Sequence, residues 1–178
     1  MKSFYEFVEN PTGANYRKIL DQLAAGPEYR PYARHIEQIH SLLDAGEYEK
    51  AFEACRRSTG TLLLSPEVHM LAGHAARKLG EEGLFKLERV ITSACIRGIL
   101  DTGDGSKEDP YVVSVTGDEY FVLEVLKKQS ASQALVKNDE RYLDLITTTE
   151  GEEIYFDVTK PYMNLRSQFG SRAEDSSE

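Results

Sequence analysis

A set of residues that recurs at an interval of 34 positions constrains this chain more than any other feature. Two of them are glycines, Gly46 and Gly80, and each follows a segment whose apolar residues have helical spacing. An acidic residue and two histidines repeat at the same interval: Glu47 and Glu81, His35 and His69, His40 and His74. Four identities within the 13 positions 35–47 exceed the roughly one expected by chance. The interval predicts two successive helix–turn–helix hairpins.

Local signals place the helices of these hairpins. The run Ser65-Pro66-Glu67 is typical of a helix start, with serine as N-cap, proline at the first helical position and an acid in the first turn. Gly46 and Gly80 are typical of helix ends. We predict helices over residues 32–45, 48–58, 67–79 and 82–99, and two weaker ones over residues 2–9 and 14–25.

The hairpins resemble tetratricopeptide repeats, a family of 34-residue helical hairpins. The segment L-L-D-A-G-E-Y-E-K-A-F over residues 42–52 is similar to that family's turn and second helix, and Pro66 lies where the family has a helix-breaking proline. The resemblance covers residues 33–98. It departs from the family pattern at His35 and His69, which replace an aromatic residue, and at Phe85, which replaces a small one.

The resemblance implies a binding surface. Four side chains would line the concave groove: His40, His74, Arg77 and Lys78. Such a weakly basic strip would suit an acidic peptide or C-terminus, whereas His35 and His69 would pack between helices. The alternative is that an array of two hairpins has no working groove and that the four residues are simply solvated.

The histidines and cysteines favour structural roles. Within each histidine pair the spacing is five residues, which separates the two rings by about 140° around a helix, whereas a chelating pair needs positions i and i+4. We therefore expect no metal and no cofactor. Cys55 and Cys95 lack any flanking motif, which favours two buried, reduced thiols.

After Leu100 the chain changes to turn residues and short strands. A connector over residues 101–110 is followed by an expected strand at 111–115 and a helix from Thr116 to Lys128, for which Thr116 and Glu119 match a capping box. Three further strands, at 134–137, 141–148 and 153–158, are joined by tight turns. The predicted fold is α+β: N-terminal tetratricopeptide-like hairpins (residues 1–100) packed on a small antiparallel meander with one helix (101–170), followed by a disordered acidic tail (171–178).

The second part also resembles a known family. The segments that carry this resemblance are G-I-L (98–100), T-G-D-G (102–105), P-Y-V-V (110–113), D-E-Y-F-V-L (118–123), Y-L-D-L (142–145) and I-Y-F-D-V (154–158). They are similar to an uncharacterised bacterial family that joins tetratricopeptide-like helices to a small α+β unit. The resemblance implies this architecture and no reaction.

The charge is distributed unevenly along the chain. The net charge is −9, of which residues 1–100 contribute zero and residues 101–178 contribute all nine negative charges. An acidic balance argues against nucleic acid and anionic membranes as partners. With neither a secretory signal nor a long apolar run, we expect a cytoplasmic location and no membrane span.

No set of nucleophile, base and acid is recognisable in the sequence. The acids of the connector, Asp101, Asp104 and Asp109, fit neither a phosphate-binding loop nor an EF-hand and form at most a loose cation or junction site. The leading hypothesis is a non-catalytic module that binds a protein or peptide partner. The alternatives are a small hydrolase with a carboxylate-lined site at the junction of the two parts, and a homo-oligomer that buries aromatic residues such as Tyr29, Tyr32 and Tyr162.

Overall fold

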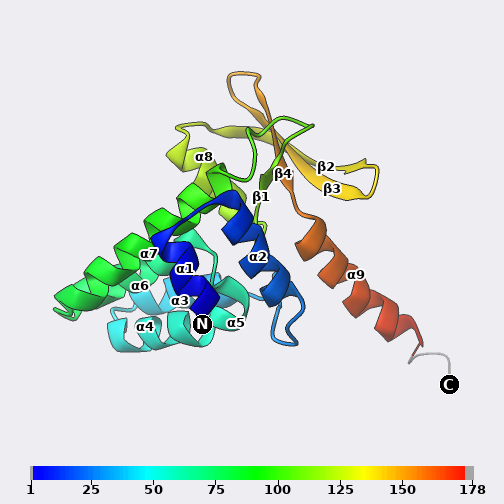
Figure 1. The fold of residues 1–178 in the computed structure, drawn as a ribbon. Coiled ribbons are helices and arrows are strands. Elements are labelled where there is room, and N and C mark those ends of the chain that lie inside the picture. Colours follow the sequence, from blue (N-terminus) through cyan, green and yellow to red (C-terminus); the bar gives the residue numbers. More distant parts are fainter. Residues whose placement is uncertain (1, 175–178) are drawn as a thin grey trace.

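The computed structural model describes the backbone of residues 2–174 and the side chains of residues 2–167. Its first hundred residues are helical (Figure 1). The helices are α1 (Lys2–Glu9), α2 (Gly13–Ala24), α3 (His35–Asp44), α4 (Tyr48–Arg57), α5 (Thr59–Leu62), α6 (Pro66–Lys78) and α7 (Glu82–Leu100). All six predicted helices are confirmed, and the single turn α5 is an addition.

The two predicted hairpins, α3–α4 and α6–α7, have the same turn geometry. Gly46 and Gly80 adopt positive φ angles of 74° and 78°, which glycine reaches without the penalty that a Cβ brings. In both turns the N–H of the next residue donates to a carbonyl five residues back, Glu47 to Leu42 and Glu81 to Ala76. This capping pattern satisfies carbonyls that the helix end leaves open, so the repeated glycines mark repeated helix ends.

The second part of the chain forms one four-stranded mixed sheet. Its strands are β1 (Tyr111–Val112), β2 (Ser130–Asn138), β3 (Arg141–Thr148) and β4 (Glu153–Asp157), in the order β1-β4-β3-β2. The predicted meander is confirmed, because β2, β3 and β4 pair antiparallel in sequence order. The first strand is shorter than expected and runs parallel to β4, with Tyr111 opposite Phe156.

Two helices of this part differ from expectation. Helix α8 is confined to Asp118–Val125, and its N-cap is Gly117, with no side-chain cap. The predicted capping box of Thr116 and Glu119 is therefore wrong, because the Glu119 side chain is buried elsewhere. Helix α9 (Thr159–Glu174) was not predicted, and it extends away from the sheet beside α2 (Figure 1). Residues 175–178 of the predicted tail lie outside the described residues.

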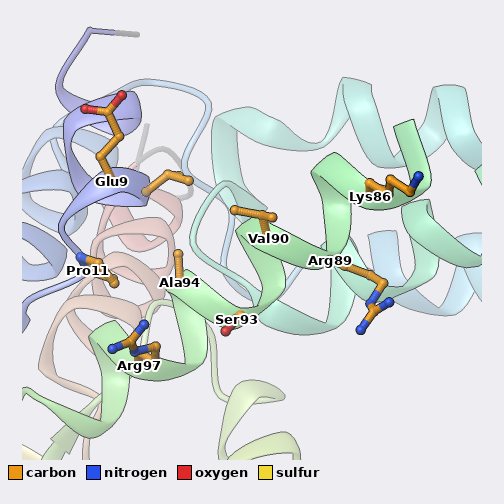
Figure 2. Close-up of a pocket in the computed structure, with 9 residues that line it drawn as sticks. Glu9, Pro11, Lys86, Arg89, Val90, Ser93, Ala94 and Arg97 are labelled. Atoms are coloured by element: carbon orange, nitrogen blue, oxygen red, sulfur yellow. The ribbon is translucent and has the colours of Figure 1, made fainter. Parts of the chain in front are cut away.

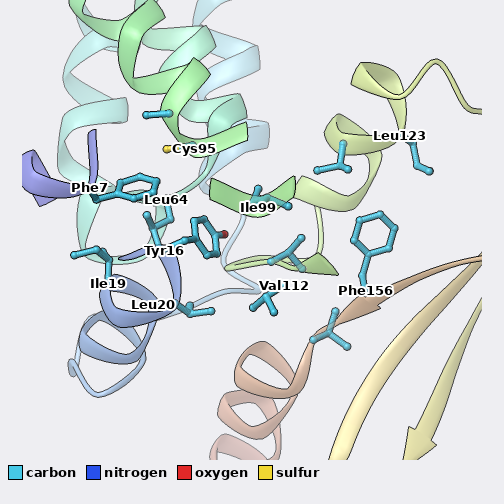
Figure 3. Packing of buried hydrophobic residues seen from close by; sticks show 14 of the residues in the cluster. Phe7, Tyr16, Ile19, Leu20, Leu64, Cys95, Ile99, Val112, Leu123 and Phe156 are labelled. Atoms are coloured by element: carbon cyan, nitrogen blue, oxygen red, sulfur yellow. The ribbon is translucent and has the colours of Figure 1, made fainter. Parts of the chain in front are cut away.

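One hydrophobic core joins the helical part to the sheet. Figure 3 shows it running from Phe7, Tyr16 and Cys95 among the helices, past Ile99, to Phe156 on the sheet. A smaller cluster lies between α3, α4 and α6, with Val115 from the second part at its edge. The change of element type near residue 100 thus does not interrupt the core.

Contacts at the helix starts reinforce this junction. Ser65 is the N-cap of α6 as predicted, but its hydroxyl makes no cap bond and instead donates to Asp118 Oδ1 at 2.6 Å, at the start of α8. Gly13 at the start of α2 donates its N–H to Asp101 Oδ2 at 2.7 Å. A Cβ at Gly13 would collide with the backbone of Asp101, so glycine permits this close approach. Within residues 2–174, no helix has both the length and the apolar character needed to cross a membrane.

Candidate functional site

A groove of about 400 Å³ lies between α6 and α7. Exposed cationic or titratable side chains line it: His74 and Arg77 from α6, and Arg89 and Arg97 from α7. Its apolar lining comes from Met70, Phe85 and Ile96. The groove therefore combines positive charge with an apolar floor, and none of its exposed lining residues is acidic.

The phenyl ring of Phe85 organises this charge. The guanidinium groups of Arg77 and Arg89 each lie 5.6 Å from its centroid, which is within the range of cation–π attraction. Among the described residues, Arg77, Arg89 and Arg97 form no ion pair. Gly73 on α6 faces Phe85 and Glu88, and the missing side chain keeps the groove open. Arg77 and Arg89 are thus held against Phe85 while their charges stay unpaired.

A second hollow of about 420 Å³ lies on the other side of Arg89 and Arg97 of α7. It is bounded by Glu9 and Pro11 of the N-terminal segment, and in Figure 2 the Glu9 carboxylate points away from α7. Arg89, Ser93 and Arg97 line both hollows. Arg89 and Arg97 on the exposed face of α7 therefore place positive charge between the two hollows.

Two of the four residues predicted to line a concave groove, His74 and Arg77, line this hollow within the second hairpin. His40 instead contacts Glu67 Oε1 through Nε2 at 3.0 Å, and Lys78 lies 5.9 Å from the ring centroid of Tyr48. Arg89 and Arg97 were missed, although their spacing of eight residues places them on one face of a helix.

The connector acids do not converge on a cation site. Asp101 accepts the N–H of Gly13, and Asp104 Oδ1 accepts the N–H of Ser106 at 2.9 Å. The bonds from Ser106 lower the pKa of the Asp104 carboxyl. The Asp109 carbonyl accepts from the N–H groups of Asp104 and Gly105, so these acids shape the connector. Among the described residues, no group of three or more His, Cys, Asp or Glu could hold a metal ion.

The remaining predicted residues have mixed outcomes. Cys55 and Cys95 are both buried and free, which confirms the prediction of unpaired thiols. His69 is buried as expected, with Nδ1 2.7 Å from Glu88 Oε2 and Nε2 3.0 Å from the Leu63 carbonyl. Tyr29 is fully buried and donates its hydroxyl to the Ser114 carbonyl at 2.5 Å, so it is unavailable to an oligomer interface.

Three carboxyl groups converge beneath the sheet where it meets the helices. Asp118 and Glu119 begin α8 and are fully buried, and Asp144 from β3 is 7% exposed. Asp118 and Glu119 both lie in the first turn of α8, but their side chains are buried. The signal was concealed because Glu119 matches a capping pattern and Asp144 lies 25 residues away along the chain.

Burial controls the protonation of this cluster. Loss of solvation raises the pKa of Asp118 to about 8, although the hydroxyls of Ser65 and Ser114 partly stabilise its charged form. Loss of solvation, followed by the neighbouring charge of Asp144, raises the pKa of Glu119 to about 10. At neutral pH the Glu119–Asp144 pair therefore holds a proton. None of these three acids has a cationic partner among the described residues.

The side-chain amide of Gln133 closes the cluster towards solvent. Its Nε2 donates to Glu119 Oε2 at 3.0 Å and to Asp144 Oδ2 at 2.9 Å, while its Oε1 accepts from the Tyr120 hydroxyl at 2.5 Å. Glu119 Oε1 is buried without a hydrogen-bond partner. Gln133 itself is exposed on β2, so a single flexible side chain separates the carboxyl pair from solvent.

The fold and these sites define an α+β protein in which a helical array and a mixed sheet share one core. A family model described as "Domain of unknown function (DUF4919)" matches residues 23–167, and the chain belongs to this family. The expected membership in an uncharacterised domain family is thereby confirmed. Searches among curated proteins and among solved structures gave no match.

Proposed function

We propose that the protein is a non-catalytic binding module whose α6–α7 groove holds an acidic segment of a partner protein. The observation that carries this proposal is the row formed by Arg77, Arg89 and Arg97, whose charges are unpaired among the described residues beside an apolar floor. Unpaired cations around a depression attract carboxylates and fix their register.

The lining predicts what the partner segment contains. Two or more carboxylates would pair with the arginines, which bind such groups with two parallel hydrogen bonds. An apolar side chain would cover Met70 and Ile96, of which Met70 is 45% exposed. An acidic peptide with one large apolar residue therefore fits both the charge and the floor.

The test compares two charge reversals of equal size. The variant Arg77→Glu/Arg89→Glu changes the groove, whereas Arg56→Glu/Arg57→Glu changes exposed arginines at the end of α4. Fluorescence anisotropy would measure binding of labelled peptides that contain Glu, Asp and one Phe, and of matched peptides with Gln and Asn instead. We expect the groove variant to lose about tenfold or more in affinity for the acidic peptides, and the α4 variant less than about twofold.

Two results would overturn the proposal. Equal losses in the two variants would show that only net charge attracts the peptides. Equal affinity of the wild-type protein for acidic and amide peptides would show that the arginines do not bind carboxylates selectively.

A further inference from the structure

The side-chain amide of Gln133 bridges Glu119 and Asp144, a position that a guanidinium group could also fill. Its amide nitrogen gives one N–H to Glu119 and the other to Asp144, as a guanidinium does when it bridges acceptors. The amide is neutral, so it donates hydrogen bonds to the carboxyl pair but does not balance the negative charge of the pair. Glu119 Oε1 still lacks a partner although Glu119 is fully buried. A cation could therefore make an additional hydrogen bond and a charge interaction that Gln133 does not make.

The surroundings of the pair favour an organic cation over a metal ion. Tyr32 is 41% exposed and Tyr120 51% exposed, and their rings can pack on a flat or alkylated cation. Burial, followed by the charges of Asp144 and Glu119, raises the pKa of the Tyr32 hydroxyl. Among the described residues the acids do not form a metal-binding group. Leu135, which is 50% exposed and lies opposite Asp144 in the β2–β3 register, adds apolar surface for an alkyl stem.

We propose that the Glu119–Asp144 pair binds the guanidinium or ammonium group of a basic ligand, which displaces the Gln133 amide. The charge of the second part of the chain favours such a ligand, because residues 101–178 carry the whole net charge of −9. The site is separate from the α6–α7 groove, which takes the opposite charge.

Proton displacement makes the binding depend on pH. The groups that face the pair are Asp118 on α8, Gln133 on β2, and Tyr32, which in turn neighbours Tyr162 on α9. A cation favours the fully ionised pair, so its binding releases up to one proton. Affinity then rises with pH by up to about tenfold per unit while the free pair remains protonated.

The ligand arm of the experiment uses a matched pair of probes. N-acetyl-arginine methylamide carries a guanidinium, and N-acetyl-citrulline methylamide has nearly the same shape without the charge. Calorimetry at about pH 7 and about pH 9, in buffers of different ionisation enthalpy, measures both affinity and proton release. We expect the arginine probe to bind about tenfold more tightly than the citrulline probe at the higher pH, with release of a proton.

The variant arm distinguishes the site from general charge attraction. Glu119→Gln/Asp144→Asn should remove the preference for arginine, whereas Glu124→Gln, an exposed change on the same helix, should keep it. Gln133→Ala should strengthen arginine binding because the competing amide is gone, a gain that a folding defect could not produce. An extended peptide that contains arginine separates the two ligand sources: tighter binding than the free probe assigns the site to a polypeptide that adds to the β2 edge, and equal binding assigns it to a small basic molecule.

The proposal is overturned if arginine and citrulline probes bind alike at both pH values, or if neither binds at about 10 mM. It is equally overturned if Gln133→Ala leaves the affinity unchanged, because Gln133 would then not cover the site.

Discussion

Glu119→Gln tests the buried carboxyl cluster through the stability of the fold. The folded protein keeps Glu119 protonated, whereas in the unfolded chain its pKa returns to the ordinary value of 4.5. At pH 7 the unfolded state therefore gains from ionisation, and holding the proton in the folded state costs 2.5 pH units, or about 3.4 kcal/mol. A glutamine has nearly the same shape, needs no proton and can donate to Asp144.

The sign of the pH dependence follows from the direction of the shift. A carboxyl whose folded pKa is raised binds more protons in the folded state, so the free energy of unfolding falls as pH rises above about 4.5 and levels off above about 10. The variant lacks this loss. Its advantage over the wild type should be absent near pH 4.5, grow by about 1.4 kcal/mol per pH unit, and reach about 1–3 kcal/mol at pH 7 after the cost of burying an amide.

Urea unfolding followed by circular dichroism at several pH values measures the difference directly. Glu124→Gln, on the exposed side of α8, is the matched control and should differ from the wild type by less than about 0.5 kcal/mol at every pH. If the two variants show the same pH trend, or if Glu119→Gln destabilises at pH 9 as much as at pH 5, the folded protein ionises Glu119 and the reasoning fails.

Two further substitutions probe the junction between the helices and the sheet. Gly98→Ala places a Cβ 2.7 Å from the ring of Phe7, so we expect thermal unfolding to show a loss of about 1–3 kcal/mol in the free energy of unfolding. Gly83→Ala on the same helix adds a Cβ with nothing within 4 Å and should stabilise the fold by about 0.5–1 kcal/mol. Equal effects of the two substitutions would contradict the packing of Gly98 against Phe7. Ser65→Ala removes the hydroxyl bonded to Asp118 and should lower the free energy of unfolding, measured by chemical unfolding, by about 1–2 kcal/mol. Most of this loss should be absent in the Asp118→Asn background. Additive losses in this double-mutant cycle would show that the bond contributes nothing.

The parts of the fold that local chemistry controls could be predicted. Gly46 and Gly80 end helices because their backbones turn to positive φ, and the strands of the meander follow from tight turns between apolar runs. Helix α9 was not predicted, because its sequence is largely polar and its position depends on distant partners. Lys160 pairs with Asp21 at 2.9 Å, and Asn164 donates to the Tyr29 carbonyl at 3.1 Å.

The candidate sites divide in the same way. Arg89 follows Phe85 by four residues and so lies on the same helix face, a pattern that the sequence contains even though the prediction stopped at Arg77. The Glu119–Asp144 pair is different, because nothing near either residue in the chain indicates burial. The pair exists only because α8 packs beneath β3, and Ser65 at α6 takes part in holding α8 there.

The core shared by the two parts has a consequence for how the chain folds. Phe7 and Tyr16 pack in one core with Cys95, Val112 and Phe156, which are made about 80 to 150 residues later. An isolated helical repeat array can fold from local contacts as each hairpin is completed. Here α1 and α2 pack on α7, so their apolar faces stay uncovered until α7 has been synthesised. Helices α1 and α2, although they precede α3 to α6, are therefore expected to gain protection from hydrogen exchange only after α7 has been made.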